Sequence, residues 1–558
     1  MDLTTVFIAA LRYLLPLLAL AVLLRAGFSL LAFRREPEIW AWLSMPNGDR
    51  LPVTHWENTI GRGRSCDVCV QYPTVSRLHA VLTRYDDGSW TVSDAASKGG
   101  VKVDGKAVTI SEVRYGQLIN LGGVDFTLVP ITPEQERAQA QYRTRPGGKM
   151  KAWVTLSLLS LFQLLLCAGL LLTTSQPLSV LMAFGGLCAI QWLLLGFYHL
   201  IRRTAFEMET LAFFLSSLGL GVMGSSCPEE LMKQMLCIII GIAVFLVVGW
   251  CLRDLDRAKT VRYLAACAGI GLLAVSLVFG TEVGGAKNWI YLGGISVQPS
   301  ELAKICFVFV GASSLDRLVT KRNLLLFLIY TGVVCACLAL LSDFGTALIF
   351  FVAFLVIAFM RSGDFATLGL VCGGVGFAGV LAVRFFPYIA RRFSAWGHVW
   401  ENALTTGYQQ TRAMMCIASG GLFGLGAGQG WLKYVAASDT DLVFAFVSEE
   451  YGLVMAILAV LAVVILAVFA VRSAPVGRSS FYTIGACAAV SILLTQTILN
   501  VFGTVDLLPL TGVTFPFLSN GGSSTVAVWG LLAFLKSADT RQNASFAIRL
   551  PNKGGDGE

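Results

Sequence analysis

The chain has 558 residues, of which 56% are hydrophobic and only 14% are charged, with a net charge of +8. Soluble domains carry about 25% charged residues, so this composition and the mean hydropathy of +0.71 exclude a wholly soluble protein. The basic residues lie in short loops between apolar runs, and we expect no nucleic-acid partner.

The first apolar run covers residues 6–33. It is too long for the hydrophobic part of a cleavable signal peptide and lacks a small-residue cleavage site. We therefore expect a retained membrane anchor over residues 1–35, with Arg34 and Arg35 on its cytoplasmic side.

Residues 38–132 break the apolar pattern. Short alternating segments such as "AVLTRY" and "SWTVSD" are divided there by Gly, Asp and Asn turns. That spacing is typical of a small all-β sandwich. The polar stretch 133–151 that follows it is predicted to be a cytoplasmic linker.

From residue 152 onward the chain returns to apolar runs of about 20 residues, the length that crosses a bilayer. The runs lie at 152–173, 177–200, 204–225, 231–251, 262–280, 299–315, 323–341, 344–361, 365–386, 443–472, 481–504 and 518–536. With the anchor, about thirteen spans are predicted. An odd number places the N-terminus outside, and the β domain and the tail 538–558 inside. The basic loops 199–203, 251–262 and 316–323 then all fall in the cytoplasm, as the positive-inside rule requires.

One outer loop is unusually long. Residues 387–441 contain no predicted span, and they include the glycine-dense stretch "SGGLFGLGAGQG" at 419–430. Long loops in compact proteins are usually functional.

Within the β domain, Gly61-Arg62 is followed by Ser76-x-x-His79 and then by a Ser-x-x-Gly turn that leads to Val-Asp-Gly. This order resembles the forkhead-associated (FHA) domain. The resemblance implies that Arg62, Ser76 and Arg77 contact the phosphate of a phosphothreonine-containing cytoplasmic protein, while His79 braces the loop. One position departs from the family, because Gly99 stands where an Asn usually holds the peptide backbone. A degenerate FHA fold used only for docking is the alternative.

Four polar stretches occupy the predicted outer ends of spans, at 284–304, 340–350, 438–452 and 500–525. Acids and lysines at membrane depth are costly and usually functional. Paired polar residues that only bridge helices are the alternative, and we favour it for Glu301 and Lys304, three residues apart on one helical face.

Taken together, these stretches resemble the SEDS family (shape, elongation, division and sporulation proteins, which include FtsW, RodA and SpoVE). The shared motifs are Trp289-Ile290, Gln298-Pro299-Ser300-Glu301, Asp343-x-Gly345-Thr346, Gly407-Tyr408-Gln409, Gly424-x-Gly426-x-Gly428, Thr440-Asp441, Glu449-Glu450-x-Gly452 and Pro516-Phe517-x-Ser519-x-Gly521-Gly522-Ser523-Ser524. The resemblance covers 204–537 and about ten spans. It leaves the anchor and a hairpin at 152–200 as additions. Departures from the family include Lys287-Asn288 before the Trp, Leu341-Ser342 before Asp343, and Asn520.

The fold class is thus predicted to be a polytopic α-helical membrane protein of the SEDS fold, with a small cytoplasmic all-β FHA sandwich. SEDS proteins are glycosyltransferases that polymerise lipid II, an undecaprenyl diphosphate-linked disaccharide-pentapeptide, outside the membrane. By resemblance Asp441 is the catalytic residue, and a carboxylate suits the removal of a proton from the acceptor sugar hydroxyl.

The resemblance and the residue types also predict a set of substrate contacts near the outer face. The set is Lys287, Trp289, Gln298, Ser300, Glu301, Lys304, Asp343, Arg391, Arg392, Gln409, Asp439, Ser519 and Ser523. The candidates to face the leaving diphosphate are Lys287, Arg391, Arg392, Arg412 and Lys433. A divalent cation, Mg²⁺ or Mn²⁺, could share that work, but the sequence assigns no metal ligand. Cys66 and Cys69 have no second pair with which to hold zinc.

Two other functions remain open. Polar residues at span ends also suit a lipid II flippase, although no inverted repeat is visible and the motifs gather on one face. The chain could instead be a membrane scaffold that reads Ser/Thr kinase signals. Resemblance also implies a class B penicillin-binding protein as partner, in division, elongation or sporulation.

Overall fold

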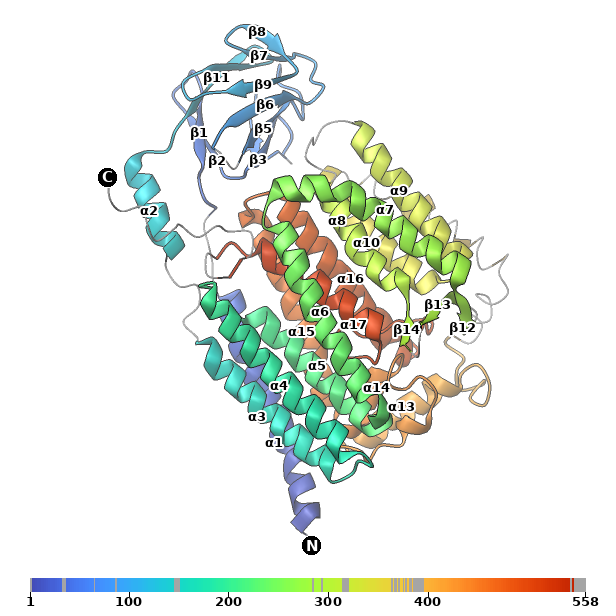
Figure 1. The fold of residues 1–558 in the computed structure, drawn as a ribbon. Helices are drawn as coiled ribbons and strands as arrows, with labels where there is room; N and C mark the ends of the chain where they lie inside the picture. Colours follow the sequence, from blue (N-terminus) through green and yellow to red (C-terminus); the bar gives the residue numbers. More distant parts are fainter. Residues whose placement is uncertain are drawn as a thin grey trace.

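The computed structural model describes residues 3–32, 37–64, 66–85, 88–144, 151–283, 286–292, 295–313, 321–362, 396–541 and 544–545, with scattered positions between 365 and 384. Figure 1 shows a small β domain standing on one end of a helical bundle, and the N-terminus lies at the opposite end. We call these the sandwich end and the far end of the bundle.

The β domain is a sandwich of two sheets. One sheet has the strand order β2-β1-β11-β10-β7-β8, and the other has the order β4-β3-β5-β6-β9. The strands are β1 (Ala41–Ser44), β2 (Arg50–Val53), β3 (Glu57–Gly61), β4 (Val68–Cys69), β5 (Ala80–Arg84), β6 (Trp90–Asp94), β7 (Val101–Val103), β8 (Lys106–Val108), β9 (Ile110–Val113), β10 (Leu118–Leu121) and β11 (Val124–Val129). Alternate residues face inward, and Leu82, Trp90 and Phe126 form part of the core between the sheets.

The bundle is built from apolar helices. They are α1 (Leu3–Leu31), α3 (Ala152–Leu171), α4 (Pro177–Leu200), α5 (Glu207–Ser226), α6 (Leu231–Leu252), α7 (Leu255–Phe279), α8 (Pro299–Ser313), α9 (Lys321–Leu340), α10 (Phe344–Ser362), α13 (Tyr408–Gly420), α14 (Val443–Glu450), α15 (Leu453–Ser473), α16 (Ser480–Thr504) and α17 (Gly522–Ala538). Among the described residues, eight helical segments are long and apolar enough to cross a membrane, and two shorter apolar helices lie at Leu326–Leu340 and Phe344–Met360. The chain is therefore a membrane protein.

Helix α5 lies at the centre of the bundle, where its candidate span is 94% buried. The hairpin α3–α4 packs on it through a polar network inside the apolar layer. Gln163 and Gln191 exchange two amide hydrogen bonds of 3.0 and 2.9 Å, and Gln163 also donates to Ser217 Oγ of α5 at 2.9 Å. Since amides in hydrocarbon have no water to bond, this network fixes the hairpin against α5.

Two expected elements differ in the structure. The apolar run 443–472 is not one span, because Gly452, with φ of +92°, separates α14 from α15. The stretch 133–151, for which the sequence predicted no helix, contains α2 (Pro133–Thr144). Both corrections have a local cause: apolar content does not reveal a left-handed glycine, and a charged helix lacks the apolar periodicity used to find helices.

The β domain contacts the turn between α15 and α16. Glu57 accepts hydrogen bonds from Ser479 Oγ (3.0 Å) and Ser480 Oγ (2.5 Å), and Trp56 N donates to Arg478 O at 2.6 Å. Arg478 also pairs with Glu38 at 3.1 Å. Strand β3 therefore begins at the bundle and carries its other end, Gly61, away from it.

Candidate active site and candidate phosphopeptide site

The segment that bears Asp441 is held by its backbone from three directions. Asp441 N donates to Ala437 O at 2.9 Å, and Asp441 O accepts from Asn500 Nδ2 of α16 at 3.0 Å. Ser519 Oγ donates to Thr440 O at 2.6 Å. The backbone of the Asp441 segment is thus fixed by contacts to α16, to the Ser519 turn and to Ala437.

The Asp441 carboxylate lies half-buried at the far end, close to the loop after α16. A Cβ at Gly512 would come within 3.3 Å of Asp441 Oδ2, and Gly512 has a φ of +71°. A glycine therefore suits this position on two counts, because it allows the left-handed backbone and leaves room beside the carboxylate.

Asp439 has a different environment. Its Oδ2 accepts from Asn520 Nδ2 at 2.7 Å and from Cys227 Sγ at 3.4 Å, and its backbone O accepts from Asn520 N at 2.8 Å. Burial, with a contribution from the Asp439 charge, raises the pKa of Cys227 to about 12, so the thiol stays protonated and donates. Asp439 therefore differs from Asp441 in that its side chain is bonded to Asn520 and Cys227, and the sequence did not predict either contact.

A second polar cluster surrounds Asp343. Its Oδ1 accepts from Thr346 N at 3.1 Å, the usual bond of a helix N-cap, here for α10. Its Oδ2 accepts from Asn288 Nδ2 at 2.8 Å and from Gln298 Nε2 at 3.2 Å. Gln298 N in turn donates to Ser523 Oγ at 3.1 Å. Three of the expected substrate contacts, Gln298, Asp343 and Ser523, are therefore brought together at the far end.

Glu301 and Lys304 lie deeper, on α8 below Gln298. They form a buried ion pair of 2.6 Å. Ser300 is fully buried, and within the described part of the chain neither Ser300 Oγ nor Glu301 Oε2 has a hydrogen-bond partner. The two side chains pair within α8, as their spacing of three residues predicts, and the role of these residues in substrate binding stays a prediction.

Two adjacent glutamates organise the glycine-rich loop. Glu449 accepts from the backbone N of Trp431 and of Leu432, both at 2.9 Å. Glu450 accepts from Gly428 N at 2.9 Å and from Ser225 Oγ at 2.7 Å. A buried carboxylate is costly unless it is hydrogen-bonded, and the backbone N–H groups of the loop provide those bonds to Glu449 and Glu450.

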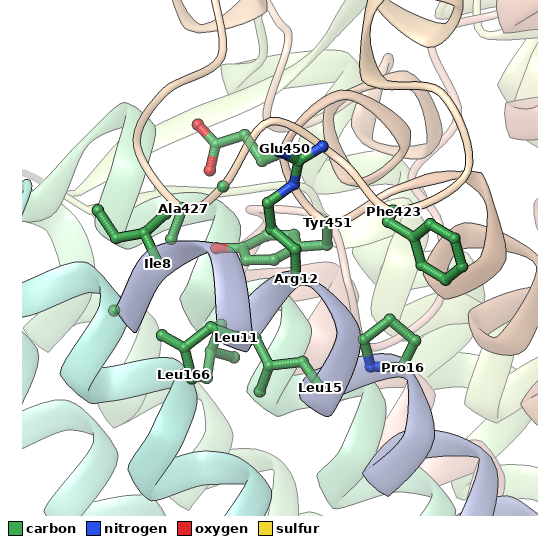
Figure 2. Close-up of a pocket in the computed structure, with 12 residues that line it drawn as sticks. Ile8, Leu11, Arg12, Leu15, Pro16, Leu166, Phe423, Ala427, Glu450 and Tyr451 are labelled. Carbon is green, nitrogen blue, oxygen red and sulfur yellow. The ribbon is translucent and has the colours of Figure 1, made fainter. Parts of the chain in front are cut away.

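The added helix α1 reaches the same loop. Figure 2 shows Arg12, Glu450 and Tyr451 around a small cavity, with Phe423 at its side. Its volume is about 20 Å³, enough for one water molecule. Arg12 Nε and the Tyr451 hydroxyl have no hydrogen-bond partner among the described residues.

The remaining expected contacts are spread over the far end. Lys287 is exposed on β13 (Ala286–Leu292), which lies between β12 (Thr281–Val283) and β14 (Ile295–Val297), and Trp289 is half-buried on the same strand. Gln409 Nε2 donates to Ala436 O at 2.9 Å, next to the Asp441 segment. Arg391 and Arg392 lie outside the described residues.

The described residues do not form a metal centre. No group of three or more His, Cys, Asp or Glu side chains in that part of the chain is placed to hold an ion. The Asp439 carboxylate is already bonded to Asn520 and Cys227. The described residues therefore assign no set of ligands to a divalent cation, and no chemical step is assigned to one.

The loops expected to read phosphate meet at the end of the sandwich remote from the bundle. Arg62 N donates to Ser76 O at 2.9 Å, and Lys98 N donates to Ser76 Oγ at 3.0 Å. His79 is fully buried, accepts from Ser76 N at 3.0 Å and lies 3.0 Å from Gly100 O. Its position agrees with a bracing role. Arg62 and Arg77 are exposed, and so is Lys98, a cation that the motif alone did not single out.

Gly99 has a structural explanation. A Cβ at this position would lie 2.7 Å from Gly122 Cα, closer than real Cβ atoms approach. Gly122 itself has a φ of +58°. The Asn that FHA domains usually carry cannot be accommodated here without a backbone shift, because two loops touch through their glycines.

Comparisons with known proteins agree with this architecture. The family model described as FtsW/RodA/SpoVE, cell cycle protein, matches residues 191–544, and the FHA domain model matches residues 58–122. RodA of Mycobacterium leprae, named a peptidoglycan glycosyltransferase, is 31% identical over 324 residues, which are 54% of this chain and 68% of that protein.

Two further proteins extend the comparison. The probable peptidoglycan glycosyltransferase FtsW of Escherichia coli O6:H1 is 33% identical over 293 residues, covering 50% of this chain and 70% of that one. A solved structure described as a peptidoglycan synthase complex that coordinates polymerization and crosslinking matches with a TM-score of 0.50 and 25% identity, over 59% of this chain and 96% of that chain. This chain therefore belongs to the FtsW/RodA/SpoVE family and carries an FHA domain ahead of the family's membrane core.

Proposed function

We propose that this chain is a peptidoglycan glycosyltransferase that polymerises lipid II into glycan strands, with Asp441 as its catalytic residue. Relatives at 31% and 33% identity are named for this activity. The observation that carries the assignment is the position of Asp441. Its segment is anchored through backbone atoms to α16 and to the Ser519 turn, and its half-buried carboxylate lies beside Gly512.

The reaction needs a general base for the acceptor hydroxyl and a positive group that stabilises the charge on the leaving diphosphate. The Asp441 carboxylate takes the proton of the acceptor sugar hydroxyl while that oxygen bonds to the anomeric carbon of the donor. The bond from that carbon to the diphosphate breaks, and the diphosphate leaves with the electron pair on the opposite face, so configuration inverts. A positioned base contributes about 10²–10⁴-fold. Exposed Lys287 at the same end is a candidate to meet the diphosphate.

The far end is proposed to face outside the cell, and the sandwich end to face the cytoplasm. The loops at the sandwich end are rich in basic residues, among them Arg202, Arg203, Arg253 and Arg257. Positive charge in short loops marks the cytoplasmic side. The FHA domain then lies where kinases act, and the candidate active site lies where glycan strands are made.

Polymerisation by the purified chain is the direct test. Labelled lipid II should be converted to long polymer, seen on a gel, by the protein in detergent or in vesicles. A protein that moves lipid II across vesicles but makes no polymer would be a flippase, and that result would falsify the proposal. The class B penicillin-binding protein expected by resemblance should co-purify under conditions that retain activity, and its absence there would contradict that partnership.

The FHA domain is proposed to recruit a phosphothreonine-containing cytoplasmic protein through Arg62, Ser76 and Arg77. Charge-assisted bonds to a phosphate are about twice as strong as neutral ones, so Arg62→Ala should weaken phosphopeptide binding about tenfold or more. Polymerisation by the purified variant should be unchanged, since Arg62 lies on the end of the sandwich remote from the bundle. Calorimetric titration with a phosphothreonine peptide library measures this. If no peptide binds better when phosphorylated, the domain is a docking platform only.

A further inference from the structure

Helices α1 and α15 enclose an apolar groove at the surface of the bundle. The groove has a volume of about 330 Å³ and is lined by carbon-rich side chains, including Leu20, Leu24 and Phe28 of α1 and Leu461 of α15. Both helices are among those long and apolar enough to cross a membrane. The groove therefore faces the acyl chains of a bilayer, not water.

A second cavity continues this groove toward the sandwich end. Its volume is about 570 Å³, and its walls come from the last turns of α1 and α15 and from residues 539–541 after α17. Leu31, Ala32 and Arg472 line both spaces. The groove and the cavity thus form one site that is apolar along the helices and polar where they end.

The two arginines that line the cavity differ in how many of their N–H groups are already bonded. Arg541 engages both oxygens of Asp539, at 3.0 Å from Nε, and also pairs with Glu207 at 3.0 Å. Arg472 is exposed and donates only one described hydrogen bond, from Nη1 to Leu31 O at 3.1 Å. Among the described charged groups that line the cavity, Arg472 is therefore the one whose N–H groups can still bind a ligand, and its positive charge favours an anion.

We propose that this site binds one anionic glycerophospholipid of the bilayer, with its phosphate at Arg472 and one acyl chain between α1 and α15. From Leu20 to Leu31 the groove follows α1 for about 17 Å at 1.5 Å per residue. That is about half of the roughly 30 Å hydrocarbon core, the depth of one acyl chain. Guanidinium groups bind phosphate oxygens through two parallel hydrogen bonds.

A net negative headgroup is favoured over a zwitterionic one. The ammonium of a zwitterionic lipid would lack an anion to pair with, because the Asp539 carboxylate is occupied by Arg541. A charge left unpaired at a partly buried site is costly. The bound lipid would join α1, which lies outside the residues that the family model matches, to α15 of the family core.

The test compares two lipids on the full chain in detergent. Dioleoylphosphatidylglycerol should bind with higher affinity than dioleoylphosphatidylcholine in native mass spectrometry and should raise the melting temperature more. Arg472→Gln should lower the phosphatidylglycerol affinity about tenfold, and Arg472→Lys should lower it less, because lysine keeps the positive charge but not the two parallel hydrogen bonds. Arg257→Gln is the matched control, because Arg257 is a partly exposed arginine at the same end of the bundle, stacked on Trp250.

The groove has its own pair of variants. Leu24→Trp fills it and should reduce lipid binding, whereas Leu17→Trp, on the exposed face of α1 and outside the groove lining, should not. Equal binding of the two lipids, or full phosphatidylglycerol binding by Arg472→Gln, would overturn the proposal. Glycerol phosphate alone should give no shift, and an equal shift from it would make the ligand a free phosphate instead of a lipid.

Discussion

Asp439 and Asp441 are one residue apart, but the structure gives their carboxylates different surroundings. Asp439 is bonded through its side chain to Asn520 and Cys227, and Asp441 is positioned through its backbone. We expect Asp441→Ala to abolish polymerisation, a loss of at least about 10²-fold. Asp439→Ala should be milder, because it removes a neighbour that shapes the loop. Gel assays of the two purified variants, with melting curves to show that both are folded, measure this. Full activity of Asp441→Ala would end the assignment.

Gly99 shows how a departure from a family pattern can have a packing cause. Because Gly99 and Gly122 touch, Gly99→Asn should destabilise the sandwich by about 1–3 kcal/mol, as overpacking does, and should not improve phosphopeptide binding. Hydrogen exchange of the sandwich amides in the full chain measures the loss. Gly116→Asn is the control, since nothing lies within 4 Å of a Cβ at Gly116 and Asn tolerates its φ of +87°. Tighter phosphopeptide binding by Gly99→Asn would contradict this explanation.

At the scale of elements, the α3–α4 hairpin depends on a few polar atoms in an apolar layer. Gln191→Leu leaves the Gln163 amide without its reciprocal partner and should cost about 1–2 kcal/mol. The double variant Gln163→Leu with Gln191→Leu should recover part of that loss, because replacing both partners removes the orphaned group. Thermal unfolding in detergent gives the coupling energy. Strictly additive losses would show that the two amides do not act as a pair.

The glycine-rich loop is the second element whose position depends on side chains far along the chain. Its backbone N–H groups bond to Glu449 and Glu450, which directly precede the α14–α15 break. The loop has left-handed glycines at Gly421, Gly424, Gly426 and Gly428 and makes isolated backbone bonds, such as the bond from Gln429 N to Gly426 O at 3.1 Å. The two carboxylates supply acceptors for further N–H groups of the loop, which these bonds do not satisfy.

At the scale of the whole molecule, the FHA domain is docked on the bundle and does not hang from a free tether. Glu57→Lys should open this contact, because the two serine hydroxyls lose their acceptor and Arg478 gains a like-charged neighbour. Faster hydrogen exchange at residues 474–480 is the expected readout. Glu112→Lys, an exposed acid on β9 away from the bundle, should leave that exchange unchanged. Unaltered exchange in Glu57→Lys would show that the contact does not hold the domain.

The same hairpin that receives the FHA domain ends beside the candidate active site. The α15–α16 turn bonds to Glu57 at the sandwich end, and Asn500, near the last turn of α16, bonds to the Asp441 backbone at the far end. The contact with the FHA domain and the contact with the Asp441 segment therefore lie at opposite ends of the same helix, α16.

Much of this arrangement could be predicted from the sequence, for reasons that act over short distances. Apolar runs of span length, alternating strands and glycine turns are local, and they identified a β-sandwich followed by a polytopic membrane core. Short motifs such as Thr440-Asp441 and Gln298-Pro299-Ser300-Glu301 likewise predicted that the candidate site residues lie near the ends of spans.

Only the tertiary structure decided which distant residues meet. Asn520 and Cys227 reach Asp439, Gly122 excludes a side chain at Gly99, and Arg478 and Ser479 receive the FHA domain across more than 400 residues of chain. The groove at Arg472 likewise exists only because α1 packs against α15. Such contacts leave no periodic trace in the sequence, because each depends on the packing of whole helices and loops and not on the local preference of any residue.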